Sequence, residues 1–251
     1  MFSYLRVYVF TCVRRGKTVN GLIALVGAGE YLPVMEETDR YLLASVNSKT
    51  PRVVCLPTAA GQEGDESVNR WSRMGVEHFK KLGADVQALR IIDKESANDP
   101  QFDAALKNAD LIYFSGGNPL HLYQTMQGSR AWESMQKAWS RGAVYAGCSA
   151  GAMILARKIP SFRLGQTVEG FDLVPAQYIL PHFDAIPTMF KPIIFALRKQ
   201  LKQDERMLGV DENTALVGRF GGEWKVMGHG TAHILTRGKD TVYKVGDSAP
   251  L

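Results

Sequence analysis

The chain has 251 residues, of which 45% are hydrophobic and 22% are charged, and this composition is typical of a globular protein with a sizeable core. The net charge of +5 comes from Lys and Arg residues spread along the chain, which disfavours a nucleic-acid partner. The three cysteines are widely spaced and form no CxxC motif, so we expect no disulfide framework, no zinc site and a reducing compartment, the cytoplasm.

The first segment, MFSYLRVYVFTCVRRGK, has a short apolar stretch that Arg6 interrupts and that charges follow. A signal peptide has its charges before the apolar stretch. We therefore expect residues 1–19 to be an extension outside the fold, or an extra edge strand, and residues 20–251 to form a single α/β hydrolytic domain. No apolar run reaches the roughly 20 residues that span a bilayer, so we expect no membrane partner.

Short apolar runs then alternate with helical patterns. The runs predict buried strands at 21–27, 52–60, 85–92, 111–117 and 143–149. Amphipathic patterns predict helices at 33–46, 65–83 and 129–142. This β-α alternation predicts an α/β fold, with a mainly parallel sheet sandwiched by helices.

The last part of the chain has a different pattern. Its segments are short, rich in β-forming residues and separated by turn residues, at 207–212, 214–220, 223–230 and 232–238. We expect antiparallel strands and hairpins that close one side of the sheet.

The stretch AGCSAGAMIL places Ser149 at the centre of a Gly-x-Ser-x-Gly motif, between a predicted strand and a predicted helix. In such an elbow a strained turn exposes the serine at the carboxyl end of the sheet. We therefore predict that Ser149 is a nucleophile. The neighbouring Cys148 is expected to be a small buried residue, although a thiol amidase with Cys148 as nucleophile is an alternative.

A serine nucleophile needs a base, and the chain has five histidines. His182 ends an apolar run in YILPHFD, where a sheet places groups near its carboxyl edge, and the order serine then histidine is that of nucleophile-elbow enzymes. We predict that His182 is the base, against the alternative of a hydrogen-bonded loop histidine. His78 lies in a helix among Lys and Glu and is expected at the surface. The others lie in the helix after SGGNP or in the late β region: His121, His229 and His233.

Five motifs in order, ALVGAGEYLP, SGGNPLHL, GCSAGAMIL, PHFD and GVDENTAL, resemble the serine peptidase family of dipeptidase E and cyanophycinase. The resemblance covers about residues 21–220. It implies a fold like that of class I glutamine amidotransferases. It also implies cleavage of short peptides or peptide-like polymers, notably at aspartyl bonds, without a metal or another cofactor.

The resemblance maps the family's nucleophile onto Ser149 and its base onto His182. The donors to the oxyanion map onto the backbone N–H groups of Ala150 and of Gly117 in the SGG loop. These two groups would hold the charge that develops on the attacked carbonyl oxygen.

The family's third catalytic member is an acid between the serine and the histidine. Only Glu169 and Asp172, in TVEGFD, lie in that interval. We predict Glu169 for this role and expect Asp172 to fix the GFD turn. If neither reaches His182, a water or a backbone carbonyl is the alternative partner.

Two further residues are candidates for binding substrate. Asn118 lies beside the predicted oxyanion donors and either hydrogen-bonds substrate or caps a helix. Asp211, with Glu212, begins a loop that either approaches a substrate amine or holds buried turn acids. Cyanophycinase-like members carry arginines soon after the histidine motif. This chain has none there before Lys191, which disfavours cyanophycin as the substrate.

These observations together predict a serine hydrolase of small peptides or related amides, active as a monomer or homodimer. The alternative is a catalytically silent domain of the same fold that binds a small ligand or a partner protein.

Overall fold

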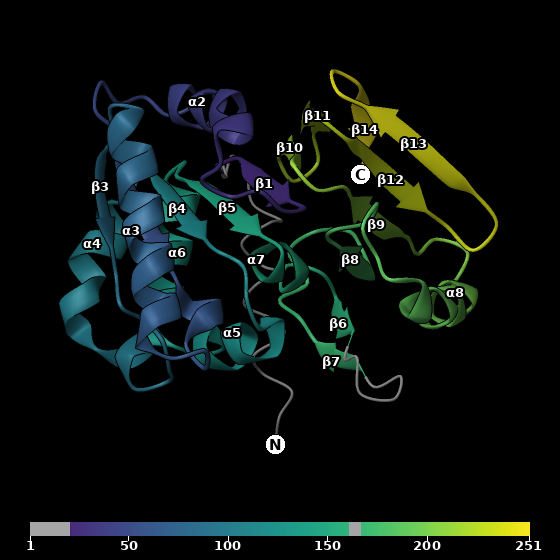
Figure 1. The fold of residues 1–251 in the computed structure, drawn as a ribbon, viewed down its shortest axis with the longest axis horizontal. Coiled ribbons are helices and arrows are strands. Elements are labelled where there is room, and N and C mark those ends of the chain that lie inside the picture. The colour runs from purple at the N-terminus through teal and green to yellow at the C-terminus, as the bar shows by residue number, and fades with distance from the viewer. Residues whose placement is uncertain (1–20, 161–166) are drawn as a thin grey trace.

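The computed structural model describes residues 21–160 and 167–251 (Figure 1). The expected extension at residues 1–19 lies outside the described residues. Within them, the largest sheet has eight strands in the order β14-β11-β10-β1-β5-β4-β2-β3.

Neighbouring strands on one side of this sheet are parallel: β1 (Ile23–Val26), β5 (Val144–Cys148), β4 (Leu111–Phe114), β2 (Arg52–Leu56) and β3 (Asp85–Ala88). The strands on the other side are antiparallel: β10 (Thr214–Gly218), β11 (Glu223–Gly228) and β14 (Ser248–Pro250). The mainly parallel sheet predicted from the sequence is confirmed, as are the antiparallel strands near the C-terminus.

Helices cover both faces of this sheet. Leu111 and Tyr113 of β4 pack in one apolar cluster, and Ile112 and Phe114 pack in the other, because successive side chains of a strand point to opposite faces. The α-helices are α2 (Glu36–Ala44), α3 (Asp65–Lys81), α4 (Asp103–Asn108), α5 (Pro119–Met126), α6 (Arg130–Ser140), α7 (Ala150–Met153) and α8 (Lys191–Lys199). Short 3₁₀ turns are η1 (Pro33–Met35), η2 (Thr58–Ala60), η3 (Ser96–Asn98), η4 (Pro100–Phe102) and η5 (Thr188–Phe190).

A second sheet lies beside the main one, with its yellow strands on the side of the molecule away from α3 (Figure 1). Its strands are β13 (Asp240–Lys244), β12 (Thr231–Leu235), β9 (Met207–Val210) and β8 (Tyr178–Leu180). A separate antiparallel pair consists of β6 (Lys158–Pro160) and β7 (Thr167–Glu169).

The second sheet departs from the expectation that all the late strands close the main sheet. β9 and β10 follow each other in the chain but belong to different sheets, and residues 211–213 connect them. Asn213 has a positive φ of 54°, a left-handed conformation that Asn tolerates better than most residues. This turn redirects the chain between the sheets. The apolar runs of β9 and β10 are alike and carry no signal of the change.

None of the helices within 21–160 and 167–251 combines the length and the apolar character that crossing a membrane requires.

Candidate active site

Ser149 occupies a strained turn between β5 and α7, with φ 50° and ψ −105°. A Cβ added to Gly147 would lie 2.4 Å from the carbonyl carbon of Gly151, and one added to Gly151 would lie 2.9 Å from Cβ of Phe114. The chain is therefore packed so closely here that only glycine fits two residues before and two residues after the serine. The conformation expected of a nucleophile elbow is present.

His182 follows β8 of the second sheet and brings its imidazole against the elbow. Its Nε2 lies 3.1 Å from Oγ of Ser149, and its Nδ1 lies 2.7 Å from Oε1 of Glu212. An ionised carboxylate only accepts hydrogen bonds, so in the neutral imidazole Nδ1 carries the proton and donates it to Glu212. Nε2 is then the acceptor for the Ser149 hydroxyl, as a general base must be.

The predicted acid, Glu169, is not the residue beside His182, and that prediction is wrong. Glu169 lies in β7 opposite Lys158, and Asp172 faces Arg157 at 3.4 Å. Both ring nitrogens of His182 already have partners, so neither acid orients the ring. Chain order does not limit which carboxylate the fold brings to a histidine, so the acid need not lie between the serine and the histidine.

Glu212 lies in the connection between β9 and β10, in the GVDENTAL motif. Its backbone N–H donates to Oδ1 of Asp184 at 2.8 Å, and Asp184 belongs to the same PHFD motif as His182. The two motifs thus hold each other in place. The sequence signal was the acidic pair at 211–212 at the end of a predicted strand, which we assigned to substrate binding rather than to His182.

The predicted oxyanion donors both lie beside Ser149. Ala150 is the first residue of α7, where an N–H has no acceptor inside the helix, and Gly117 lines the same pocket as Ser149. Within the described part of the chain, neither N–H has a protein acceptor. A Cβ on Gly117 would lie 2.5 Å from the carbonyl oxygen of Ala59, so the loop reaches this position only with glycine.

Glu30, which the sequence analysis did not single out, links the strand ends around the site. Its carboxylate is buried, accepts the backbone N–H of Gly116 at 2.7 Å, and lies 2.9 Å from Sγ of Cys148. Because the N–H of Gly116 is engaged in this way, the N–H of the adjacent Gly117 is the candidate donor from this loop. Its signal in the sequence is weak, a lone acid after the glycine turn that follows β1.

Cys148 is fully buried, as expected. Burial raises the pKa of its thiol well above 9, and the neighbouring Glu30 carboxylate raises it further. A thiol that stays protonated is a poor nucleophile. The structure therefore disfavours the thiol amidase alternative.

The predicted substrate-binding residues are engaged within the fold. Oδ1 of Asn118 accepts the first free N–H groups of α5, so Asn118 is a helix cap, which was the alternative reading. Asp211 is buried, and its Oδ2 accepts both the N–H and the hydroxyl of Thr231 at 2.8 and 2.6 Å. Neither residue lines the pocket at Ser149.

The pocket beside Ser149 has a volume of about 330 Å³ and opens to solvent. His182 and Glu212 line it on the side of the serine. The rest of its wall is mainly apolar and includes Met153, Ile186, Phe190, Ile193, Ile194 and Leu197.

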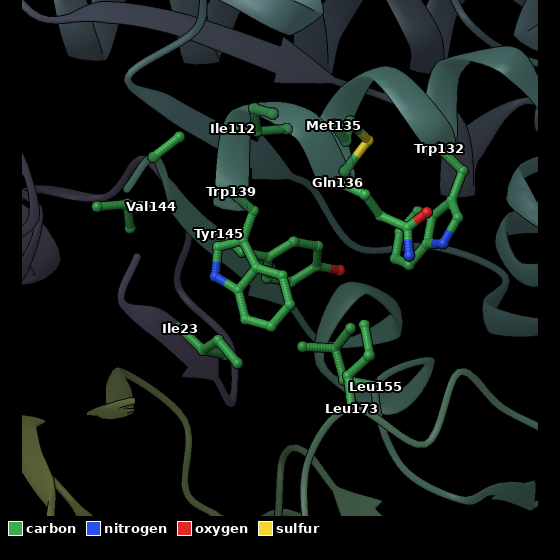
Figure 2. A pocket seen from close by; sticks show the side chains of 11 residues that line it. Ile23, Ile112, Trp132, Met135, Gln136, Trp139, Val144, Tyr145, Leu155 and Leu173 are labelled. Atoms are coloured by element: carbon green, nitrogen blue, oxygen red, sulfur yellow. The ribbon is translucent and has the colours of Figure 1, made fainter. Parts of the chain in front are cut away.

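A second cavity, shown in Figure 2, lies against the main sheet under α6. Trp132 and Trp139 of α6 and Tyr145 of β5 enclose it, and the hydroxyl of Tyr145 donates to the carbonyl of Gly151 at 2.7 Å. Its lining within the described residues has no histidine, acid or cysteine. Of these two cavities, only the one beside Ser149 has groups able to do acid–base chemistry among its described lining residues.

His78 was expected at the surface and is instead buried between α2 and α3, so that expectation is wrong. Its Nε2 lies 2.8 Å from Oδ2 of Asp39.

Among residues 21–160 and 167–251, no group of three or more His, Cys, Asp and Glu side chains is arranged to hold a metal ion.

A model of peptidase family S51 matches residues 22–222. A cyanophycinase from Nostoc sp. (strain PCC 7120) is 26% identical over 234 residues, covering 89% of this chain and 76% of that protein. The uncharacterized peptidase YgaJ of Bacillus subtilis is 30% identical over 133 residues, covering 53% of this chain and 54% of that protein.

Two solved structures are also similar. A peptidase from an acI-B1 Actinobacterium is 35% identical with a TM-score of 0.83, covering 93% of this chain and 98% of that one. A putative peptidase E protein from Listeria monocytogenes is 18% identical with a TM-score of 0.56, covering 90% of this chain and 100% of that one. This second likeness is one of fold alone.

Proposed function

The chain belongs to peptidase family S51 and is a serine-type peptidase, and we propose that it hydrolyses small peptides or peptide-like amides with Ser149, His182 and Glu212. One observation carries the proposal. A continuous chain of hydrogen bonds runs from Oγ of Ser149 through both ring nitrogens of His182 to Glu212, and it ends at a pocket that a substrate can enter.

In the first step, Oγ of Ser149 attacks the carbonyl carbon and a C–O bond forms. Nε2 of His182 takes the hydroxyl proton, and the Glu212 carboxylate stabilises the imidazolium that results. The electron pair of the C=O bond moves to the carbonyl oxygen. In this proposal the N–H groups of Gly117 and Ala150 donate to that oxyanion, and a donor of this kind typically lowers the barrier by about 3–4 kcal/mol.

In the second step, the C–N bond breaks and the imidazolium gives its proton to the leaving amine. Water then attacks the ester on Ser149 and gives a proton to His182, which returns it to the serine oxygen as the C–O bond breaks. The products are a carboxylic acid and an amine. Each proton that the reaction moves passes through Nε2 of His182.

Fluorophosphonate labelling tests the proposal. We expect the reagent to label wild type and Cys148→Ser on Ser149, and to leave Ser149→Ala unlabelled. Ser149→Ala should also lower hydrolysis of any substrate by at least about 10⁴-fold, with an unchanged circular dichroism spectrum, because alanine removes a single oxygen. Labelling at another residue contradicts the proposal. Absence of labelling in wild type supports the silent ligand-binding domain instead.

A further inference from the structure

The pocket at Ser149 is unlike a site for a charged side chain. Among the described residues that line it, Glu212 is the only acid and no lysine or arginine is present. The carboxylate of Glu212 is already hydrogen-bonded to His182.

Resting on the proposed function, we propose that this pocket binds an apolar side chain of the residue next to the scissile bond. The enzyme then prefers peptides with leucine or phenylalanine there over peptides with aspartate or arginine.

The apolar wall is built before any substrate arrives. Leu180 of β8 and Leu197 of α8 are buried members of the apolar cluster between the second sheet and α8. Ile186, Ile193 and Ile194 pack against that cluster but remain partly exposed toward the pocket. Sites for apolar ligands have this form, a preformed apolar concavity with few polar groups at one end.

Electrostatics disfavour an acidic side chain in this pocket. Against the described lining residues, an aspartate would lose its hydration without meeting a lysine or an arginine, and burial of an unpaired charge is costly. The basic residues toward the end of α8 are engaged elsewhere, since Arg198 donates to the carbonyl of Thr236 and Lys199 lies over the ring of Phe195. The charge of Glu212 repels a further carboxylate.

An arginine side chain is disfavoured for a related reason. Its guanidinium needs an acceptor, and among the described lining residues the only carboxylate is the one that orients His182. Binding arginine there would take Glu212 from the imidazole. A productive substrate therefore does not contact the carboxylate of Glu212, and it packs an apolar side chain against the wall of the pocket.

A competition assay measures this preference. Wild-type protein is given an equimolar mixture of the dipeptides X-Ala and Ala-X, in which X is Leu, Phe, Asp or Arg. The decrease in the amount of each dipeptide is followed by mass spectrometry. We expect the best Leu or Phe dipeptide to be consumed on the order of 10–100-fold faster than its Asp and Arg counterparts, the range that one apolar contact provides. Faster loss of an Asp or Arg dipeptide overturns the inference.

Two variants place a cation in the wall, Ile186→Arg and Ile193→Arg. Each variant should lower the ratio between the turnover rates of the Leu and Asp dipeptides at least about tenfold, because arginine disrupts the apolar wall and pairs with aspartate. The matched control is Met189→Arg, the same kind of change in the same segment at a side chain that is 75% exposed and outside the lining. If all three variants change the ratio equally, the inference is wrong.

Calorimetry on Ser149→Ala separates this inference from the proposed function. We expect the preferred Leu or Phe dipeptide to bind at least about tenfold more tightly than its Asp counterpart. Such a preference without cleavage by wild type overturns the proposed function and leaves the apolar pocket standing. Cleavage by wild type without such a preference supports the proposed function and overturns the inference of an apolar pocket.

Discussion

Two histidines of this protein each bind a carboxylate at nearly the same distance, yet the two pairs lie in opposite surroundings. His182 and Glu212 are 2.7 Å apart and their side chains are 43% and 41% exposed. His78 and Asp39 are 2.8 Å apart and 4% and 1% exposed. The second nitrogen of His182 faces Ser149 and the pocket, whereas the rings of Tyr31 and Phe79 lie against His78.

A hydrogen-bonded pair of histidine and carboxylate does not by itself define a catalytic group. The buried pair joins α2 to α3, and no substrate can reach it. The exposed pair contributes little to the free energy of unfolding, because solvent screens it, but it orients a base beside a nucleophile. Exposure and the partner of the second nitrogen separate a structural pair from a reactive one.

Removing the charge of the exposed acid should have the largest effect. Glu212→Gln keeps the shape of the side chain but no longer stabilises the imidazolium, and we expect kcat to fall about 10²–10⁴-fold. The free energy of unfolding should stay within about 0.5 kcal/mol of wild type. The assay is kcat on the best dipeptide, with Glu169→Gln as the matched control at wild-type rate. A low rate in Glu169→Gln with a normal rate in Glu212→Gln would reverse the assignment.

Breaking the buried pair should lower the free energy of unfolding and leave kcat unchanged. His78→Ala leaves the Asp39 carboxyl buried without its partner, and burial already raises the pKa of that carboxyl. We expect the free energy of unfolding in urea to fall by about 3–5 kcal/mol, with kcat of the folded protein unchanged.

A double variant is the control for that measurement. Adding Asp39→Ala to His78→Ala removes the uncompensated group and should restore part of the loss. If His78→Ala costs less than about 1 kcal/mol, the range of exposed pairs, then the contrast between the two pairs does not hold.

The smallest effect is expected at Cys148, a further buried group next to a carboxylate. Because burial raises the pKa of its thiol well above the ordinary value of a cysteine, the thiol stays protonated at pH 8 and the reactive thiolate does not form there. Iodoacetamide at pH 8 should therefore leave Cys148 unmodified and activity unchanged, as peptide mapping and a rate assay can show. Modification of Cys148 that parallels loss of activity would restore the thiol alternative.

The sequence predicted the elements of the site that depend on local pattern. Ser149 lies in a five-residue motif whose glycines are required by close contact, and His182 ends a strand-like run. Glu212 could not be assigned to His182, because their contact depends on where the second sheet docks. That sheet was itself unforeseen, since the apolar run of β9 resembles that of any strand in the main sheet.

The burial of His78 was present in the sequence but was judged from the wrong neighbours. Lys80 and Glu77 are close to it in the chain, whereas the buried face of α3 repeats at helical spacing and consists of Val68, Gly75, His78 and Phe79. Helical periodicity, rather than adjacency, is the relevant pattern. It places this histidine in the core.

The connection at residues 211–213 has a consequence for motion. Ser149 is fixed to the main sheet, His182 follows a strand of the second sheet, and Glu212 lies on the segment that joins the two. Sliding of one sheet over the other by about 1 Å would lengthen the 3.1 Å contact between Ser149 and His182, and a misplacement of that size can slow a reaction about 10²-fold. The turnover rate therefore depends strongly on the relative position of the two sheets, and it responds to displacements too small to disturb either sheet.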